Sequence, residues 1–116
     1  AEPRHPFHHP AQLVRDARQA GYVVHLHAIL VPLALCLARV PLRHAQGGHS
    51  VPEDRIRERY QRLWPLISQA ITLANAARVY DNSSARKPYR VVATYENGRL
   101  IGEAAWPAWS AWRGQV

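Results

Sequence analysis

The chain has one cysteine, Cys36, and no methionine among its 116 residues. A single cysteine excludes an internal disulfide framework. Because Cys36 lies in an apolar run, we expect it to be a small buried hydrophobic residue rather than a nucleophile. Cysteine usage of this kind favours a reducing compartment, and we expect the cytoplasm. No set of ligands at a recognisable spacing predicts a metal site.

Acidic residues are also few, with eight Asp and Glu against fifteen Lys and Arg. The net charge is therefore +7 and the isoelectric point lies near 10.5. This balance favours an anionic partner, namely a nucleotide, a nucleic acid or an acidic protein. The length fits one domain or part of one, and an apolar content of 47% is enough for a core.

A long hydrophobic run of the membrane-spanning kind is not evident. Residues 21–38 carry no charge, but His25, His27 and Pro32 interrupt them. A strand followed by a helix fits this stretch better than a span, so we expect no membrane.

The hydrophobic pattern predicts an α/β fold. Residues 11–20 should form a short amphipathic helix with Leu13, Val14 and Ala17 inside. Residues 22–30 are apolar almost throughout, so we expect a strand buried on both faces. His27, toward the carboxyl end of that strand, is either a ligand contact or, as we prefer, a satisfied core histidine. A helix over residues 33–46 follows, and Pro41 should kink it.

The second half begins with a long helix, starting at residues 50–52, with a bend expected at Pro65. Its predicted buried stripe consists of Ile56, Tyr60, Leu63, Ile67, Ala70 and Ala74. Residues 78–83 should form a short strand, and residues 90–95 and 100–103 a β-hairpin across Asn97-Gly98. The three tryptophans of the tail, Trp106, Trp109 and Trp112, should pack on the body as a cap. Exposed, they would form a partner site.

The most basic stretch of the chain is residues 39–62, which hold six arginines around Gly47-Gly48. Arg39 and Arg43 share one predicted helix face. Arg55, Arg59 and Arg62 share a face of the next helix. Two arginine faces that meet across a glycine hinge suit a polyanion, because guanidinium groups bind phosphate in a bidentate manner. A solvated surface with no ligand is the alternative.

Three ordered motifs carry a family resemblance over roughly residues 11–95. The central motif reads Arg43-x-x-x-Gly47-Gly48-His49-x-Val51-Pro52-x-x-x-Ile56-x-x-Arg59-Tyr60. It is flanked by Gly21-Tyr22-x-Val24-x-Leu26-His27-Ala28-Ile29 and by Val79-Tyr80-Asp81-Asn82-Ser83. Together these motifs resemble the lid region and flanking segments of the zeta-toxin family of P-loop kinases.

The resemblance implies a three-layer, parallel-sheet nucleotide-kinase fold, here with a terminal β-hairpin. It also implies transfer of the ATP γ-phosphate to a small molecule, with UDP-N-acetylglucosamine as a known family acceptor, and control by an antitoxin protein. The lid would cover residues 39–62, and the hairpin and tail residues 90–116.

One family feature is missing from these residues. The chain has no G-x-x-x-x-G-K-[ST] motif, and its only lysine is Lys87. A P-loop kinase needs that motif to hold the β- and γ-phosphates and magnesium. We therefore interpret the chain as the C-terminal half of a longer kinase, inactive alone. The other half would carry the P-loop, the general base and the Mg²⁺ ligands.

The resemblance also assigns roles to particular residues. Arg43 and Arg59 match the motif and are expected to contact the transferring phosphate, and Arg39 and Arg55 lie one turn earlier on the same faces. His49 would order the lid or touch the nucleotide. Asn82 is either a nucleotide contact or a structural turn residue. The alternatives from other classes are a basic nucleic-acid-binding module with tryptophans stacked on bases and a non-catalytic partner-binding domain.

Overall fold

The computed structural model describes residues 9–38, 52–110 and 112. Two helices are fully described, α1 (Pro10–Gln19) and α3 (Glu53–Leu73). The strands are β1 (His25–Leu30), β2 (Ala76–Asp81), β3 (Arg90–Glu96) and β4 (Arg99–Ile101). Residues 33–38 are helical and begin the helix expected over 33–46, while the rest of that helix and Pro41 lie outside the described residues.

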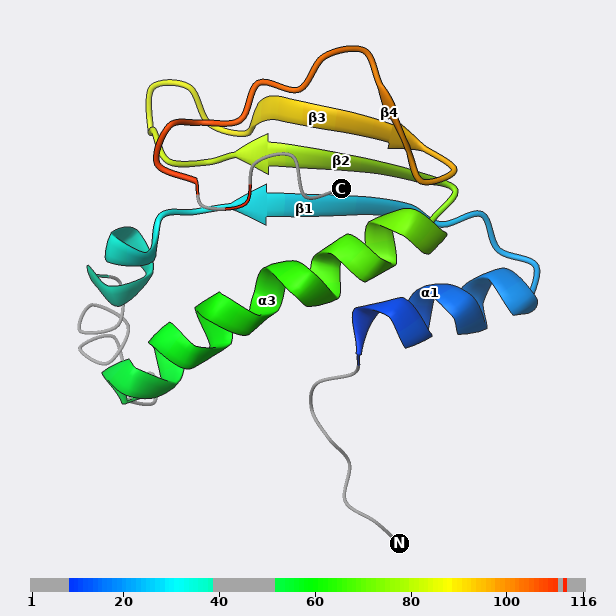
Figure 1. Cartoon of the computed structure of the whole chain (residues 1–116), viewed down its shortest axis with the longest axis horizontal. Coiled ribbons are helices and arrows are strands. Elements are labelled where there is room, and N and C mark those ends of the chain that lie inside the picture. The colour runs from blue at the N-terminus through cyan, green and yellow to red at the C-terminus, as the bar shows by residue number, and fades with distance from the viewer. Residues whose placement is uncertain (1–8, 39–51, 111, 113–116) are drawn as a thin grey trace, which may run out of the picture.

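The strands form one mixed sheet in the order β1-β2-β3-β4 (Figure 1). β1 and β2 are parallel, and the β2–β3 and β3–β4 pairs are antiparallel. The parallel pair needs a long crossover, which residues 31–75 supply and which includes α3. The predicted α/β class and the terminal hairpin are thus confirmed, whereas the described sheet is mixed, with one parallel pair.

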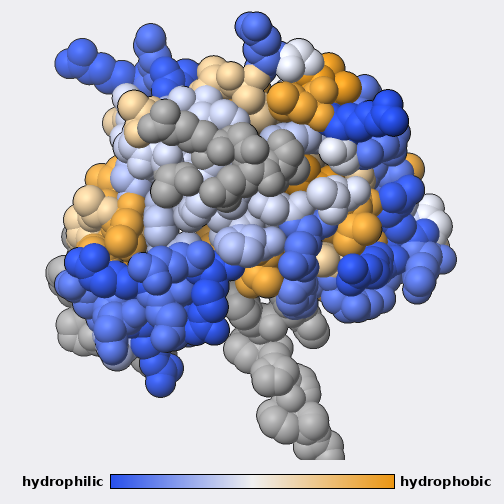
Figure 2. All heavy atoms as spheres, viewed as in Figure 1, coloured by the Kyte–Doolittle hydropathy of each residue, from blue (hydrophilic) through white to orange (hydrophobic). Residues whose placement is uncertain are grey.

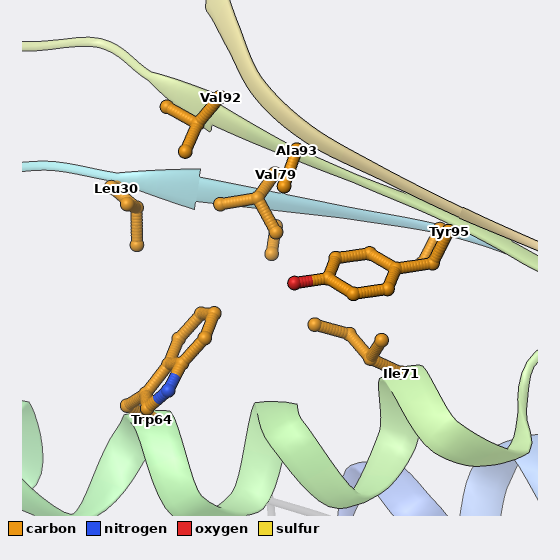
Figure 3. Close-up of a cluster of buried hydrophobic side chains, with 9 residues drawn as sticks. Leu30, Trp64, Ile71, Val79, Val92, Ala93 and Tyr95 are labelled. Carbon is orange, nitrogen blue, oxygen red and sulfur yellow. The ribbon is translucent and has the colours of Figure 1, made fainter. Parts of the chain in front are cut away.

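One face of the sheet is covered by α3. Figure 3 shows Leu30, Val79 and Tyr95 pointing from the strands toward Trp64 and Ile71 on the helix. These five side chains are each at most 3% exposed and belong to the main core cluster. Burial of such large apolar side chains is the main force that holds the helix to the sheet.

Helix α1 packs on α3 rather than on the sheet centre. Val14 joins Ala70 and Ala74 in a second buried cluster. Small alanines let the two helices approach closely, and the Arg18 guanidinium donates to the carbonyl oxygen of Leu73 at 2.8 Å near the end of α3. This bond satisfies one of the carbonyl groups that a helix end leaves without an intrahelical partner.

The predicted stripe of the long helix was only partly right. Ala70 and Ala74 are buried as predicted. Trp64 and Ile71, each 1% exposed, were not in the stripe, while the predicted Leu63 is 40% exposed. The reason is that α3 has two packing partners. Trp64 and Ile71 face the sheet, and Ala70 faces α1, so a single stripe does not describe the helix.

The prediction for the first strand was wrong in two respects. The strand begins at His25, and Val23 is 71% exposed. Its burial alternates, with Leu26, Ala28 and Leu30 on the covered face and His25, His27 and Ile29 exposed. Leu13 of α1, predicted inside, is 52% exposed.

The structure contains the predicted β-hairpin and the predicted packing of the tail on the body. Asn97 and Gly98 have φ values of 49° and 79°, as a tight hairpin turn requires. Beyond β4, the Ala105 amide donates to the carbonyl oxygen of Val92 at 2.8 Å, so the tail runs beside β3. The three tail tryptophans pack against the main core as the expected cap, and two of them contact Trp64.

Candidate functional site

The structure describes three of the six predicted site residues. Arg55 and Arg59 lie on α3, and Asn82 directly follows β2. The other three, Arg39, Arg43 and His49, lie outside the described residues.

The arginines of α3 fall into two groups. Arg57 forms an ion pair with Glu53 at 3.1 Å, and Arg62 forms one with Glu58 at 2.5 Å. Arg55 and Arg59 are exposed, and their guanidinium groups have no carboxylate partner within the described part of the chain. They are four residues apart and so share a helix face. Their two guanidinium groups remain available for an anion.

The amino-terminal half of α3, which carries these arginines, lies beyond the carboxyl ends of the parallel strands. β1 and β2 both end on the side where the amino-terminal half of α3 extends past the strands (Figure 1). Figure 2 shows that hydrophilic residues gather over the same part of α3. In open α/β sheets this edge, at the carboxyl ends of parallel strands, is where ligands bind.

Tyr60 ties α3 to the carboxyl end of β1. Its hydroxyl donates to the carbonyl oxygen of Val31, just after β1, at 2.8 Å, and its ring lies 4.9 Å from that of Trp112. Burial is the main cause that raises the pKa of Tyr60; the Cys36 thiol raises it further, and the backbone of Leu33 opposes the shift. Tyr60 therefore stays protonated and keeps donating this hydrogen bond.

A groove of about 480 Å³ lies between α3 and the 33–38 helix, with Arg59 and Arg62 among its polar lining residues. Its other lining residues are Cys36, Ile56, Tyr60, Leu63 and Leu66. A second cavity of about 240 Å³ shares Cys36, Tyr60 and Leu63 with it and reaches Trp64. The exposed Arg59 thus lines the rim of a mainly apolar hollow.

Asn82 has a structural role in this fold. Its side-chain oxygen accepts a hydrogen bond from the backbone amide of Tyr89 at 3.2 Å. Its backbone amide donates to the carbonyl oxygen of Leu30 at 2.9 Å. The bond to Tyr89, whose φ is 52°, closes the loop of residues 82–89. These bonds support the interpretation of Asn82 as a structural turn residue. Only its side-chain nitrogen, Nδ2, is left to contact a ligand.

Asp81, the last residue of β2, is a further polar residue at these strand ends. Its carboxylate accepts from Arg90 at 2.8 Å and from the Ser83 amide at 2.9 Å. Burial raises the pKa of Asp81, but the hydrogen bonds from Ser83 and the charge of Arg90 outweigh burial, so the pKa is lowered. Asp81 is thus an ionised, fully engaged carboxylate and is unsuited to act as a general base.

The uncovered face of the sheet holds polar residues that the sequence analysis did not place together. His27 Nδ1 lies 2.8 Å from the Tyr80 hydroxyl, and the two rings stack at 5.7 Å. His27, expected in the core, is exposed. Arg78, opposite His27 in the register, helps to line a shallow depression of about 450 Å³. A reading of residues 25–30 with a period of two would have placed His25 and His27 on one exposed face. The apolar residues on both sides of the histidines led instead to the prediction of a strand buried on both faces.

No protein-family model, curated protein or solved structure matches this chain. Within residues 9–38 and 52–110, no helix is long and apolar enough to cross a membrane. The same part of the chain has no cluster of three or more His, Cys, Asp or Glu side chains that could hold a metal ion.

Proposed function

We propose that this chain is the lid-bearing part of an ATP-dependent small-molecule kinase of the zeta-toxin kind. One observation carries the proposal. The guanidinium groups of Arg55 and Arg59 share a face of α3 without carboxylate partners in the described structure, and they belong to the half of this helix that extends past the carboxyl ends of β1 and β2. Two free guanidinium groups on that half of the helix suit the phosphates of a nucleotide.

The pairing pattern on α3 gives the argument its specificity. Within one helix, Arg57 and Arg62 are neutralised by Glu53 and Glu58. Arg59, which matches the family motif, is not neutralised. An arginine that stabilises the charge of a transferring phosphoryl group can contribute on the order of a thousandfold or more to the rate. Arg39, Arg43 and His49 would complete the lid from the segment that leads into α3.

The proposal assigns the remaining kinase parts to polypeptide other than these residues. The P-loop, the general base and the Mg²⁺ ligands would be supplied there, and MgATP would bind between that part and the lid. The parallel β1–β2 pair would be this chain's contribution to a three-layer parallel sheet. The same resemblance implies a UDP-sugar acceptor and an antitoxin partner, and the cysteine usage favours a cytoplasmic location.

The test is equilibrium binding of MgATP to the chain and to two matched variants. Arg59→Ala removes an unpaired arginine, and Arg57→Ala removes a paired one on the same helix. We expect Arg59→Ala to weaken binding about tenfold or more, because it removes a charge-assisted phosphate contact. Arg57→Ala should leave binding nearly unchanged. Equal effects of the two substitutions would contradict the proposal.

The same assay separates the kinase from a nucleic-acid-binding module. Binding of an oligonucleotide without nucleotide preference, falling steeply with salt, would support the module instead. The packing of the tail does not favour the base-stacking part of that alternative. The tail tryptophans pack on Trp64 in the core, with ring separations of 5.5 Å for Trp106 and 5.4 Å for Trp112, rather than standing free to stack on bases.

A further inference from the structure

Strand β1 has an open edge. In the described part of the chain it pairs only with β2, on one side. The opposite edge of the sheet is protected, because β4 is three residues long and the tail beyond it bonds to β3 through Ala105 and Val92. Short strands and covering loops are the usual means of blocking edge-to-edge association. Among the described residues, only the β1 edge lacks such protection.

The backbone groups on this edge can be assigned to particular residues. The carbonyl oxygens of Val24 and Leu30 accept amides from Ala76 and Asn82, on the β2 side. Because the N–H and C=O of one strand residue point the same way and alternate along the strand, even-numbered residues bond to β2. The N–H and C=O groups of His25, His27 and Ile29 therefore point away from the sheet and have no partner among the described residues.

The side chains around this edge do not discourage a new strand. Residues 21–38 contain no charged residue, and β1 has no proline. The sequence thus lacks the lysines and prolines that typically protect edge strands. Ile29 is 49% exposed and Val23 71% exposed. An added strand would bury part of this apolar surface.

The segment is also complementary to itself. In an antiparallel pair centred on His27, Leu26 meets Ala28, His25 meets Ile29, and the exposed Val23 meets Val31 of the second copy. All pairs join residues of equal parity, so the covered faces of both sheets stay on the same side. The outward backbone groups of odd residues then face one another, as hydrogen-bonded antiparallel pairs require.

We propose that two copies of this chain pair antiparallel along β1, around a two-fold axis at His27, to form one continuous sheet. The charge of +7 on each copy opposes association in general, but the edge itself is uncharged, so the repulsion is weakest there. This proposal does not depend on the kinase function. A P-loop-bearing segment that extended the parallel sheet would compete for the same edge.

The first experiment measures molar mass by light scattering across a wide range of concentration. We expect a dimer in the parent chain. His27→Lys places like charges directly opposite each other on the axis and should weaken the dimer about tenfold or more. Leu100→Lys adds the same charge at the protected edge and should leave the dimer intact. A monomer at all concentrations, or equal effects of both variants, would overturn the proposal.

The second experiment fixes the register. Hydrogen-bonded antiparallel residues have Cα atoms about 5.5 Å apart, within the range that a disulfide spans. In a Cys36→Ser background, His27→Cys should oxidise to a covalent dimer, and Arg78→Cys, on the same face but one strand inward, should not. Failure of His27→Cys to cross-link while the chain is dimeric would exclude this pairing. Loss of the dimer on adding a P-loop-bearing segment would assign the edge to that segment instead.

Discussion

Asp81 shows how one residue ties the end of β2 to the following loop. The side chain is almost fully buried, yet its ion-pair partner Arg90 is 56% exposed. Its hydrogen bonds to Ser83 and Arg90 need the ionised carboxylate. Because the pKa of Asp81 is lower in the folded chain than its ordinary value, the ionised form stabilises the fold.

The corresponding prediction concerns stability and pH. Asp81→Asn should lower the free energy of unfolding by about 1.5–3 kcal/mol at neutral pH, since it weakens hydrogen bonds to a charged group. The contribution of Asp81 is complete above the ordinary pKa of an aspartate and is lost as pH falls through the lower folded-state value. Parent and variant should therefore converge in acid, as measured by urea unfolding across that pH range.

Glu103→Gln, at an exposed position, is the control for the loss of one negative charge. Because this side chain is exposed, the substitution should leave the stability at neutral pH nearly unchanged. A constant difference between Asp81→Asn and the parent down to the lowest pH would mean that Asp81 acts by packing and not by charge.

Gly98 connects two elements, the β3–β4 turn and the end of α3. Its φ is +79°, and a Cβ added there would lie 2.9 Å from the carbonyl oxygen of Thr72. Gly102 has a similar φ of +72°, but a Cβ there would have no atom within 4 Å. The two glycines therefore separate the effect of backbone conformation from the effect of close packing.

Gly102→Ala should lower the free energy of unfolding by about 1–2 kcal/mol, through the left-handed backbone alone. Gly98→Ala should cost about 1–3 kcal/mol more, because the helix backbone has to move. Chemical denaturation of both variants tests this. Equal losses would show that the contact between the turn and α3 is not tight in solution.

Most elements could be predicted from sequence, because each has a strong local signal. The periodicity of residues 53–73, the Asn97-Gly98 turn and the β-branched residues of β2 and β3 needed no tertiary information. What covers each face could not be read in this way. The apolar sequence of β1 predicted two buried faces, yet one face is exposed. The stripe on α3 was misassigned because a helix that packs on both a sheet and α1 buries two faces.

The candidate site was predictable to a similar degree. Spacing alone placed Arg55 and Arg59 on one face of α3. The same spacing rule also predicts the i, i+4 pairs Glu53–Arg57 and Glu58–Arg62, which the sequence analysis did not consider and which the structure shows. The carboxamide of Asn82 was ambiguous, since its bond to Tyr89 joins residues that are seven positions apart in the sequence.

At the scale of the whole molecule, the tail is part of the core. Trp106 and Trp112 both contact Trp64, the first edge-on at 87° and the second nearly parallel at 13°. Trp112 also contacts Tyr60, whose hydroxyl is bonded to the end of β1. The tail, the helix and the sheet thus share one set of contacts, which is the condition for cooperative unfolding.

The last prediction follows from that shared packing. Thermal unfolding measured by near-UV circular dichroism, which reports on the tryptophans, should coincide with unfolding measured in the far-UV, which reports on helices and strands. Trp112→Ala should shift both midpoints down together, because it removes contacts of Trp64 and Tyr60 at once. A tryptophan signal that changes before the far-UV signal would mean that the tail detaches first, and the core would then consist of α3 and the sheet alone.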